Sequence, residues 1–142
     1  MRILTTLAST VVAFAACGGN KNVQTADKPA GATRAQVTGT VFYLERVALP
    51  PGATLTVQLA DVSIADLPAD VIAAETKPIT TQVPIPFSLS YDPQRIIPMH
   101  GYVVQARIEV EGKLRYINTT SNPVITNGRP TTADIRVSPV SQ

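Results

Sequence analysis

The sequence is poor in the residues that build disulfides, metal sites and charged binding surfaces. Its 142 residues include one cysteine, one histidine and only 15% charged side chains, against roughly 25% in an average soluble domain. One cysteine excludes an internal disulfide, and a zinc site takes about three or four Cys or His ligands. The formal net charge of +2 gives no strong electrostatic attraction to nucleic acid. We therefore expect no metal, no cofactor and no nucleic-acid partner.

Long apolar runs are also missing. The longest stretch, residues 3–16, is diluted by threonine and serine and follows a single positive charge at Arg2. A membrane-spanning helix needs about twenty apolar residues, so this stretch is too short to be a permanent anchor. Its length and its small residues at the end are typical of a secretory signal peptide.

The end of this signal indicates lipid attachment. Phe14-Ala15-Ala16-Cys17 resembles a bacterial lipobox, although Phe14 stands where Leu, Val or Ile is usual. We predict that Cys17 is lipidated, palmitate included, and becomes the mature N-terminus, because several acyl chains hold a protein on a membrane more lastingly than one. In lipoproteins generally, Gly18 instead of Asp directs sorting to the outer membrane. The alternative is an ordinary signal-peptidase site with Cys17 incidental.

Composition divides the rest of the chain into a tether and one body. Residues 18–35 contain almost no large apolar side chain and should form a flexible tether with a root-mean-square span of about 23 Å. Residues 36–140 are long enough for a single domain with a real core. The 44% apolar content excludes disorder throughout. The twelve prolines exceed the usual ~5% share and exclude a helical bundle.

Alternating patterns predict that the body is all-β. Residues 83–91 place Val, Ile, Phe, Leu and Tyr at odd positions and Pro or Ser at even ones, and residues 102–111 alternate as cleanly. Further strands are expected at residues 37–44, 55–59, 71–79, 114–117 and 133–137. With turn signals between them, seven or eight short strands indicate an antiparallel two-sheet β-sandwich. The least certain strand is 71–79, since residues 69–76 could instead form two helical turns after Pro68.

The hairpin around Gly112 allows two registers. A two-residue loop would place Ile108 opposite Arg115. A three-residue loop would pair Val110 with Leu114 and Ile108 with Tyr116, which keeps one face apolar and is therefore the register we expect.

Few residues offer catalytic chemistry. His100 lies in a Pro-Met-His-Gly turn without a Gly-x-Ser-x-Gly motif, so it is expected to be solvent-exposed. Paired carboxylates would serve a glycosidase, and the pairs to consider are Asp61 with Asp66 and Glu109 with Glu111. The latter two lie on a polar strand face, where solvated charge is expected. Asp61 stands where the alternation of Leu55, Val57 and Leu59 would place an apolar residue. Its expected role is a structural ion pair with Arg46. No catalytic residue is predicted.

Five segments of the body together form a recognisable pattern: Val37-Thr-Gly39-Thr-Val, the segment from Tyr43 to Ala53, Thr56-Val-Gln-Leu59-Ala-Asp61-Val-Ser63, Pro84-Ile-Pro86-Phe87-Ser-Leu-Ser-Tyr91-Asp92-Pro93 and Pro123-Val-Ile-Thr126. They resemble the YbaY family of bacterial lipoproteins, which shares its domain with the YscW-type pilot lipoproteins of type III secretion. The resemblance covers residues 36–137 and implies a β-sandwich lipoprotein without enzymatic activity. It implies no binding residues. Pilot proteins of this kind escort a secretin subunit to the outer membrane.

Three hypotheses about function follow. The first is a non-enzymatic lipoprotein on the outer membrane, facing the periplasm, whose sandwich binds an unknown periplasmic or outer-membrane protein. The second is a secretin pilot that binds a partner tail by strand addition or in a groove. The third and weakest is an envelope hydrolase that depends on His100.

Prolines predict which sheet edge is closed. Pro84 and Pro86 remove donors from one side of their strand, which blocks pairing with another chain. Residues 133–137 contain no proline and would offer an open edge if they lie at the other side. A proline at Ile135 should then remove a donor from that edge.

Overall fold

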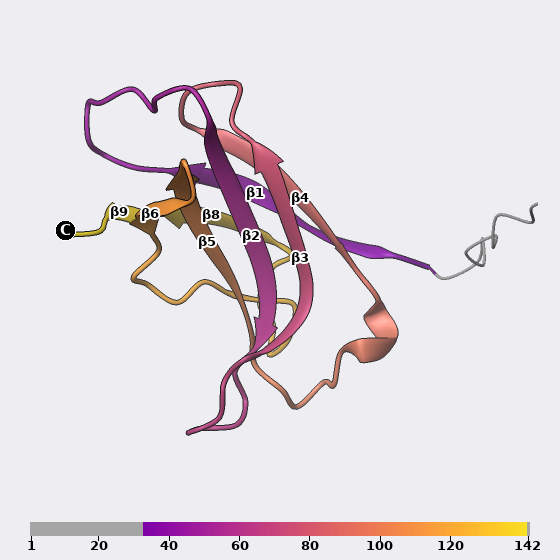
Figure 1. Ribbon diagram of the computed structural model, residues 1–142. Helices are drawn as coiled ribbons and strands as arrows, with labels where there is room; N and C mark the ends of the chain where they lie inside the picture. Colours follow the sequence, from indigo (N-terminus) through magenta and orange to yellow (C-terminus); the bar gives the residue numbers. More distant parts are fainter. Residues whose placement is uncertain (1–32, 142) are drawn as a thin grey trace, which may run out of the picture. The chain divides into compact units, whose positions relative to one another are not determined.

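The computed structural model describes residues 33–141, and these form a β-sandwich (Figure 1). Besides strands, the described chain has one short 3₁₀ helix, η1 (Pro93–Arg95), whose first turn is capped by Asp92. None of the helical structure in residues 33–141 is long and apolar enough to cross a membrane. The predicted all-β sandwich is confirmed, while Cys17 and most of the predicted tether lie outside the described residues.

The two sheets differ in size. The small sheet has the spatial order β4 (Ile85–Tyr91), β1 (Ala35–Phe42) and β8 (Thr132–Arg136). The large sheet runs β3 (Asp70–Pro78), β2 (Ala53–Asp61), β5 (Tyr102–Val110), β6 (Lys113–Ile117) and β9 (Ser138–Pro139), and β7 (Pro123–Val124) also pairs with β5. All pairs are antiparallel except β1 with β8, which is parallel. The expectation of a purely antiparallel sandwich is therefore corrected at that one pair.

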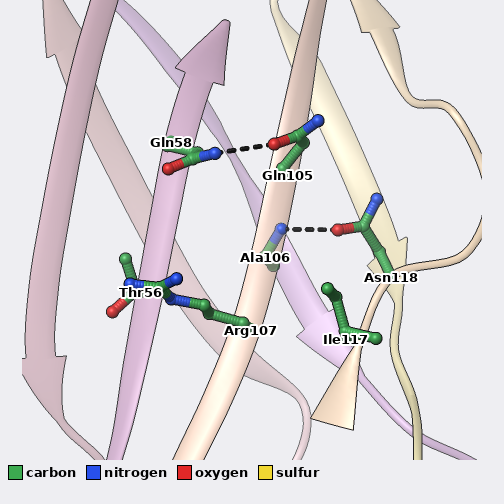
Figure 2. A pocket seen from close by; sticks show the side chains of 7 residues that line it. All are labelled: Thr56, Gln58, Gln105, Ala106, Arg107, Ile117 and Asn118. Atoms are coloured by element: carbon green, nitrogen blue, oxygen red, sulfur yellow. Dashed lines mark hydrogen bonds between the residues drawn. The ribbon is translucent and has the colours of Figure 1, made fainter. Parts of the chain in front are cut away.

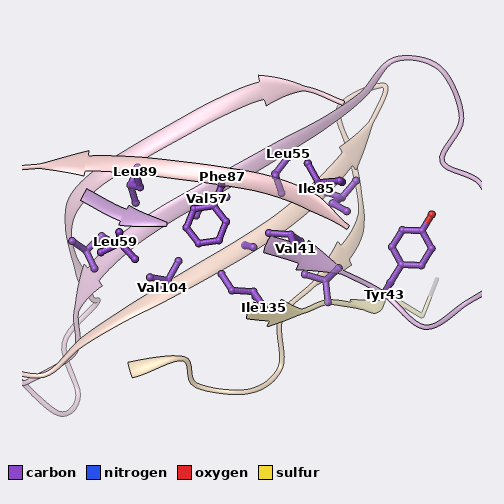
Figure 3. Packing of buried hydrophobic residues seen from close by; sticks show 14 of the residues in the cluster. Val41, Tyr43, Leu55, Val57, Leu59, Ile85, Phe87, Leu89, Val104 and Ile135 are labelled. Carbon is purple, nitrogen blue, oxygen red and sulfur yellow. The ribbon is translucent and has the colours of Figure 1, made fainter. Parts of the chain in front are cut away.

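The core lies between the sheets and follows the predicted alternation (Figure 3). In β4 the four odd residues, Ile85 to Tyr91, are each at most 6% exposed, whereas Ser88 between them is exposed. The even residues of β5 are buried in the same way and belong to the same core cluster. Period-two alternation works here because successive side chains of a strand point to opposite faces of its sheet.

β3 is a strand, so the helical alternative for residues 69–76 is wrong. It pairs along nearly all its length with β2, and the Thr56 and Thr76 hydroxyls lie 3.0 Å apart across the pair. A bulge at Ile72 interrupts the ladder. Pairing with a central strand outweighs the weak helical preference of Ala73, Ala74 and Glu75.

The β5–β6 hairpin combines parts of both registers considered from the sequence. Its loop is two residues, because Glu111 and Gly112 both have positive φ, at 51° and 76°, as a type I′ turn requires. The predicted Val110–Leu114 pair is therefore wrong, and Val110 pairs with Lys113. A bulge then shifts the register, so Ile108 lies opposite Tyr116 as predicted.

The sequence predicted seven or eight strands, whereas residues 33–141 form nine. The two missed strands, β7 and β9, are two residues long. A strand of that length has no measurable period, and it forms only because a longer neighbour offers hydrogen-bonding groups.

Candidate functional site

The β4 edge of the small sheet is partly blocked against further strands. Pro86 has no N–H, and its carbonyl accepts a hydrogen bond from Lys77 Nζ of β3. Thr38 N–H donates to the Thr131 carbonyl on the β8 side, so the backbone groups of Val37 and Val41 point to β4, where these residues lie opposite Leu89 and Ile85. The backbone groups of even β4 residues therefore point away from β1, and the missing donor of Pro86 is on the outer side, as predicted from the sequence. Pro84, the other proline of that prediction, precedes β4.

The β8 edge on the opposite side of this sheet is open. Among residues 33–141, β8 pairs with β1 alone. Thr38 N–H donates to the Thr131 carbonyl, and Val137 N–H donates to the Phe42 carbonyl, at 3.0 and 2.9 Å. Hydrogen-bonding direction alternates along a strand, so the N–H and C=O groups of Thr132, Asp134 and Arg136 point away from β1. The predicted open edge is confirmed as an edge, and it offers a row of donors and acceptors.

β1 and β8 approach each other closely because of Gly39. A Cβ at this position would lie far inside van der Waals contact of the Ala133 carbonyl oxygen, a backbone atom that cannot move aside cheaply. Thr40 Oγ1 donates to Asp134 Oδ1 at 2.8 Å on the solvent side of the same pair. Ile135 and Val137 are fully or almost fully buried. These contacts hold β8 firmly on one side and leave its other side free.

The side chains on the solvent face of β8 are polar. Thr132, Asp134 and Arg136 are exposed, and charges of both signs stand two residues apart on a short strand. Such charges discourage random pairing of edges but leave room for a partner with complementary charges.

At one end of the sandwich, a hydrogen-bonded junction joins the loops after β2 and before β5. His100 Nδ1 lies 2.6 Å from Asp61 Oδ2, and because a carboxylate only accepts, Nδ1 carries the proton. The Ser63 hydroxyl accepts from Gly101 N–H at 2.7 Å, and Thr126 Oγ1 donates to the His100 carbonyl at 2.6 Å. Thus three loops are fixed at one point.

This junction corrects two sequence-based expectations. Asp61 turns inward as expected, but it bonds His100 and not Arg46, which is exposed. His100 is only partly exposed, with 32% of its side-chain surface accessible. Burial raises the pKa of Asp61, but hydrogen bonds from Ser63 and His100 outweigh burial and lower it from 3.8 to about 2. Asp61 therefore stays ionised across the neutral range.

The remaining carboxylates that the sequence singled out are not brought into a joint site. Glu109 lies 3.5 Å from Arg107 on the solvent face of β5. Glu111 is in the hairpin turn, and Asp66 is exposed in the β2–β3 loop. In the described part of the chain, no three His, Cys, Asp or Glu residues cluster as metal ligands would.

A shallow pocket of about 170 Å³ lies on the outer face of the large sheet (Figure 2). Gln58 Nε2 donates to Gln105 Oε1 at 2.6 Å, and Ala106 N–H donates to Asn118 Oδ1 at 2.8 Å. Its amide side chains therefore bond one another or the sheet backbone, and the Thr56 hydroxyl lies 3.0 Å from that of Thr76. The pocket is thus a hydrogen-bonded part of the sheet surface.

Sequence analysis missed an apolar patch at the end of the sandwich that carries His100. Six of the nine large apolar side chains exposed in residues 33–141 are here. A groove of about 490 Å³ is lined in part by three of them, Ile64, Leu67 and Ile97. The sequence did contain a sign of this patch, because these apolar residues stand among turn residues, where no strand period accounts for them. We call this patch the apolar end, and its members are Val62, Ile64, Leu67, Val71, Ile97 and Met99.

Comparisons with known proteins agree with this architecture. The profile of the family described as type III secretion system lipoprotein chaperone (YscW) matches residues 32–137. The uncharacterized lipoprotein YbaY of Escherichia coli (strain K12) is 40% identical over 126 residues, or 87% of this chain. The chain covers 64% of the length of that relative.

A solved structure has the same fold. It is that of an alternative pilotin from the type II secretion system of Vibrio cholerae, with a TM-score of 0.75 and 44% identity over 78% of this chain and 100% of that one. Together with the match over most of the described residues, this establishes the relationship. The chain belongs to the family of YbaY- and YscW-type bacterial lipoproteins.

Proposed function

We propose that this protein is a non-enzymatic lipoprotein of the bacterial envelope that holds an extended segment of another envelope protein against the outer side of β8. It is anchored to the outer membrane through lipid on Cys17, and its sandwich faces the periplasm. The observation that carries the proposal is the contrast between the two edges of the small sheet. One edge is blocked at Pro86, which has no donor and whose carbonyl is bonded by Lys77, so its outward donors are limited to Ser88 and Ser90. The other has outward N–H and C=O groups along its whole length, at Thr132, Asp134 and Arg136.

Strand addition explains why the two edges of the small sheet differ. An unpaired edge is a liability that proteins normally block with proline, charge or a covering element. Where a rigid edge is left open, main-chain hydrogen bonds give affinity to an added strand and alternate side chains give selectivity. Because Ile135 and Val137 anchor β8 in the core, the edge is already formed before a partner binds.

The arrangement around His100 supports a role without catalysis. The His100 ring is hydrogen-bonded to Asp61, and the nearby Ser63 hydroxyl accepts from a backbone N–H. A nucleophile activated by this histidine would need to hydrogen-bond its other ring nitrogen. The contacts of this dyad instead fix loops, which is a structural role.

A secretin is the partner class that the comparisons favour. The matching family is described as a secretion-system lipoprotein chaperone, and the solved relative is described as a pilotin. A pilot would hold an exposed segment of a secretin subunit until the subunit assembles. The β8 edge suits such a segment, since an extended tail can pair along it without a preformed fold.

Two proline variants test the docking edge. Arg136→Pro removes an outward-facing donor from β8, and Ser88→Pro removes an outward-facing donor from β4, without loss of a ladder hydrogen bond in either strand. With a photo-crosslinker on the solvent face of β8, Arg136→Pro should abolish capture of the envelope partner, while Ser88→Pro should leave it unchanged. Thermal unfolding must first show that both variants fold.

The crosslinker position is itself informative. A probe at Asp134 should capture the partner, and one at Ser90 on the other edge should not. Capture from Ser90 alone, or capture that survives Arg136→Pro, contradicts docking at β8. Identification of the crosslinked peptide by mass spectrometry distinguishes a secretin from another envelope protein.

A further inference from the structure

The apolar end is a second exposed surface, separate from the β8 edge, and its side chains project strongly. Ile64 and Leu67 in the β2–β3 loop are each 61% exposed, Ile97 is 48% exposed and Met99 is 88% exposed. A monomeric domain rarely gathers large apolar residues at its surface unless they contact a protein, a ligand or a membrane.

The side chains of this surface project outwards, which suits contact with a fluid surface better than enclosure of a peptide chain in a cleft. The residue with the greatest exposure, Met99, is not among the residues that line the neighbouring groove. It stands on the β4–β5 connection, while Ile64 and Leu67 stand on another loop. Projecting apolar side chains on loop tips can sink into the boundary between lipid headgroups and acyl chains.

The loops are held in place as a unit. Val62 N–H donates to the Gly101 carbonyl at 2.9 Å, and the Asp61–His100 contact joins the same two loops. On the other side, Arg95 donates to the Ile72 carbonyl at 2.9 Å and lies 3.7 Å from Asp70. The apolar tips therefore do not need to be ordered when they meet a surface, which lowers the entropy cost of contact.

The charges at this end leave a small negative excess, with four aspartates against two arginines and one histidine. Two acid–base pairs are in contact, so zwitterionic headgroups would not be repelled and anionic headgroups would be repelled only weakly. A membrane contact here would depend on apolar burial and only weakly on salt or lipid charge. The charged groups of the loops at this end are Asp61, Asp66, Asp70, Asp92, Arg95, His100 and Arg129.

The chain that precedes the described residues ends at this part of the fold. β1 begins at Ala35, which pairs with Tyr91, and η1, Ile97 and Met99 follow Tyr91 directly. Seventeen residues separate Cys17 from β1, and a flexible chain of that length would have a root-mean-square span of roughly 23 Å. A domain tethered this closely keeps its loops at a high effective concentration near the lipid surface.

We propose that the apolar end rests on the lipid surface to which the protein is anchored, with Met99, Ile64 and Leu67 entering the headgroup boundary. This rests on the lipid anchor of the proposed function, but not on the β8 partner. Contact at this end restricts the orientation of the domain.

The test uses the lipidated protein reconstituted in vesicles of phosphatidylethanolamine and phosphatidylglycerol. An environment-sensitive fluorophore is attached at Met99→Cys and, as a matched control, at Leu44→Cys, which is 61% exposed in the native protein on the β1–β2 connection at the opposite end. Mass spectrometry first establishes lipid on Cys17, which leaves the introduced thiol as the only reactive one. A failure of lipidation is thus recognised separately.

We expect a blue shift and quenching by brominated lipids at position 99, with a water-like spectrum at position 44. The response at position 99 should persist in high salt and be lost with Ile64→Glu and Leu67→Glu. Water-like spectra at both positions overturn the proposal, as does an equal response at both. Shielding at position 99 that needs an added envelope protein also overturns it and assigns this end to a protein partner.

Discussion

At the residue scale, Phe87 and Ser88 show how sharply neighbouring positions differ. The Phe87 side chain is 5% exposed in the core, whereas Ser88 points to solvent. Phe87→Ala should lower the free energy of unfolding by about 3–5 kcal/mol, because it leaves a cavity between the sheets. Ser88→Ala should change it by less than about 0.5 kcal/mol. Urea denaturation of both variants checks this, and similar midpoints would contradict the strand orientation.

Asp61 should make stability depend on acid pH. Its pKa is lowered in the folded protein from 3.8 to about 2, so the unfolded chain takes up a proton first as pH falls. The stabilisation is fully present above about pH 4 and is lost as pH decreases towards 2. Asp61→Asn should therefore be less stable than the native protein at pH 6, and the difference should shrink by pH 2.5. Denaturation midpoints at both values test the sign, and a constant difference would contradict it.

Residue environments were predictable where a strand had a clear period. The buried positions of β4 and β5 followed from alternation alone, because the period fixes the face. The inward orientation of Asp61 was also predictable, because it continues the alternation that turns Leu55, Val57 and Leu59 towards the core. Its partner was not, because His100 is 39 residues away and sequence order gives no indication of which loops meet at one end of a sandwich.

At the element scale, the β1–β8 pair depends on Gly39. Gly39→Ala should push β8 away from β1 and destabilise the domain by about 1–3 kcal/mol, since a methyl group would collide with the Ala133 carbonyl. Gly101→Ala is the matched control, because a Cβ there meets nothing within 4 Å. Thermal unfolding compares the two, and equal melting temperatures would contradict the close approach.

Strand pairing also shows which part of the edge prediction needed the structure. The sequence indicated that residues 133–137 form a strand without proline, but not which of its donors point outwards. Val137 N–H bonds β1, so the Ile135 donor faces β1 as well. A proline at Ile135 would break the ladder and not the open edge, and the suitable positions are Asp134 and Arg136. A parallel partner for β8 could not be foreseen, since pairing between residues nearly a hundred positions apart has no local signal.

At the scale of the whole molecule, the lipid anchor remains a prediction. Cys17→Ser removes the thiol to which lipid attaches and leaves the described domain unchanged. The variant should move from the detergent-soluble membrane fraction to the soluble periplasmic fraction and should incorporate no labelled palmitate. If it stays in the membrane fraction and still incorporates palmitate, Cys17 is not the attachment site.

The lipid-facing end and the β8 edge would together orient the protein in the envelope. With the apolar end on the membrane, β1 and the parallel strand β8 would both run away from the lipid surface, which would leave the outer side of β8 accessible from the periplasm. A partner tail could then pair along β8 while its folded part remains outside. The anchor would supply location and the edge would supply binding.

Amide hydrogen exchange along β8 tests the central claim most directly. In the free protein, the N–H groups of Ala133, Ile135 and Val137 should exchange slowly and those of Asp134 and Arg136 quickly, because only the first set faces β1. When the partner segment identified by crosslinking is added as a synthetic peptide, Asp134 and Arg136 should become slow as well. Fast exchange of these two amides in the saturated complex would contradict strand addition at β8.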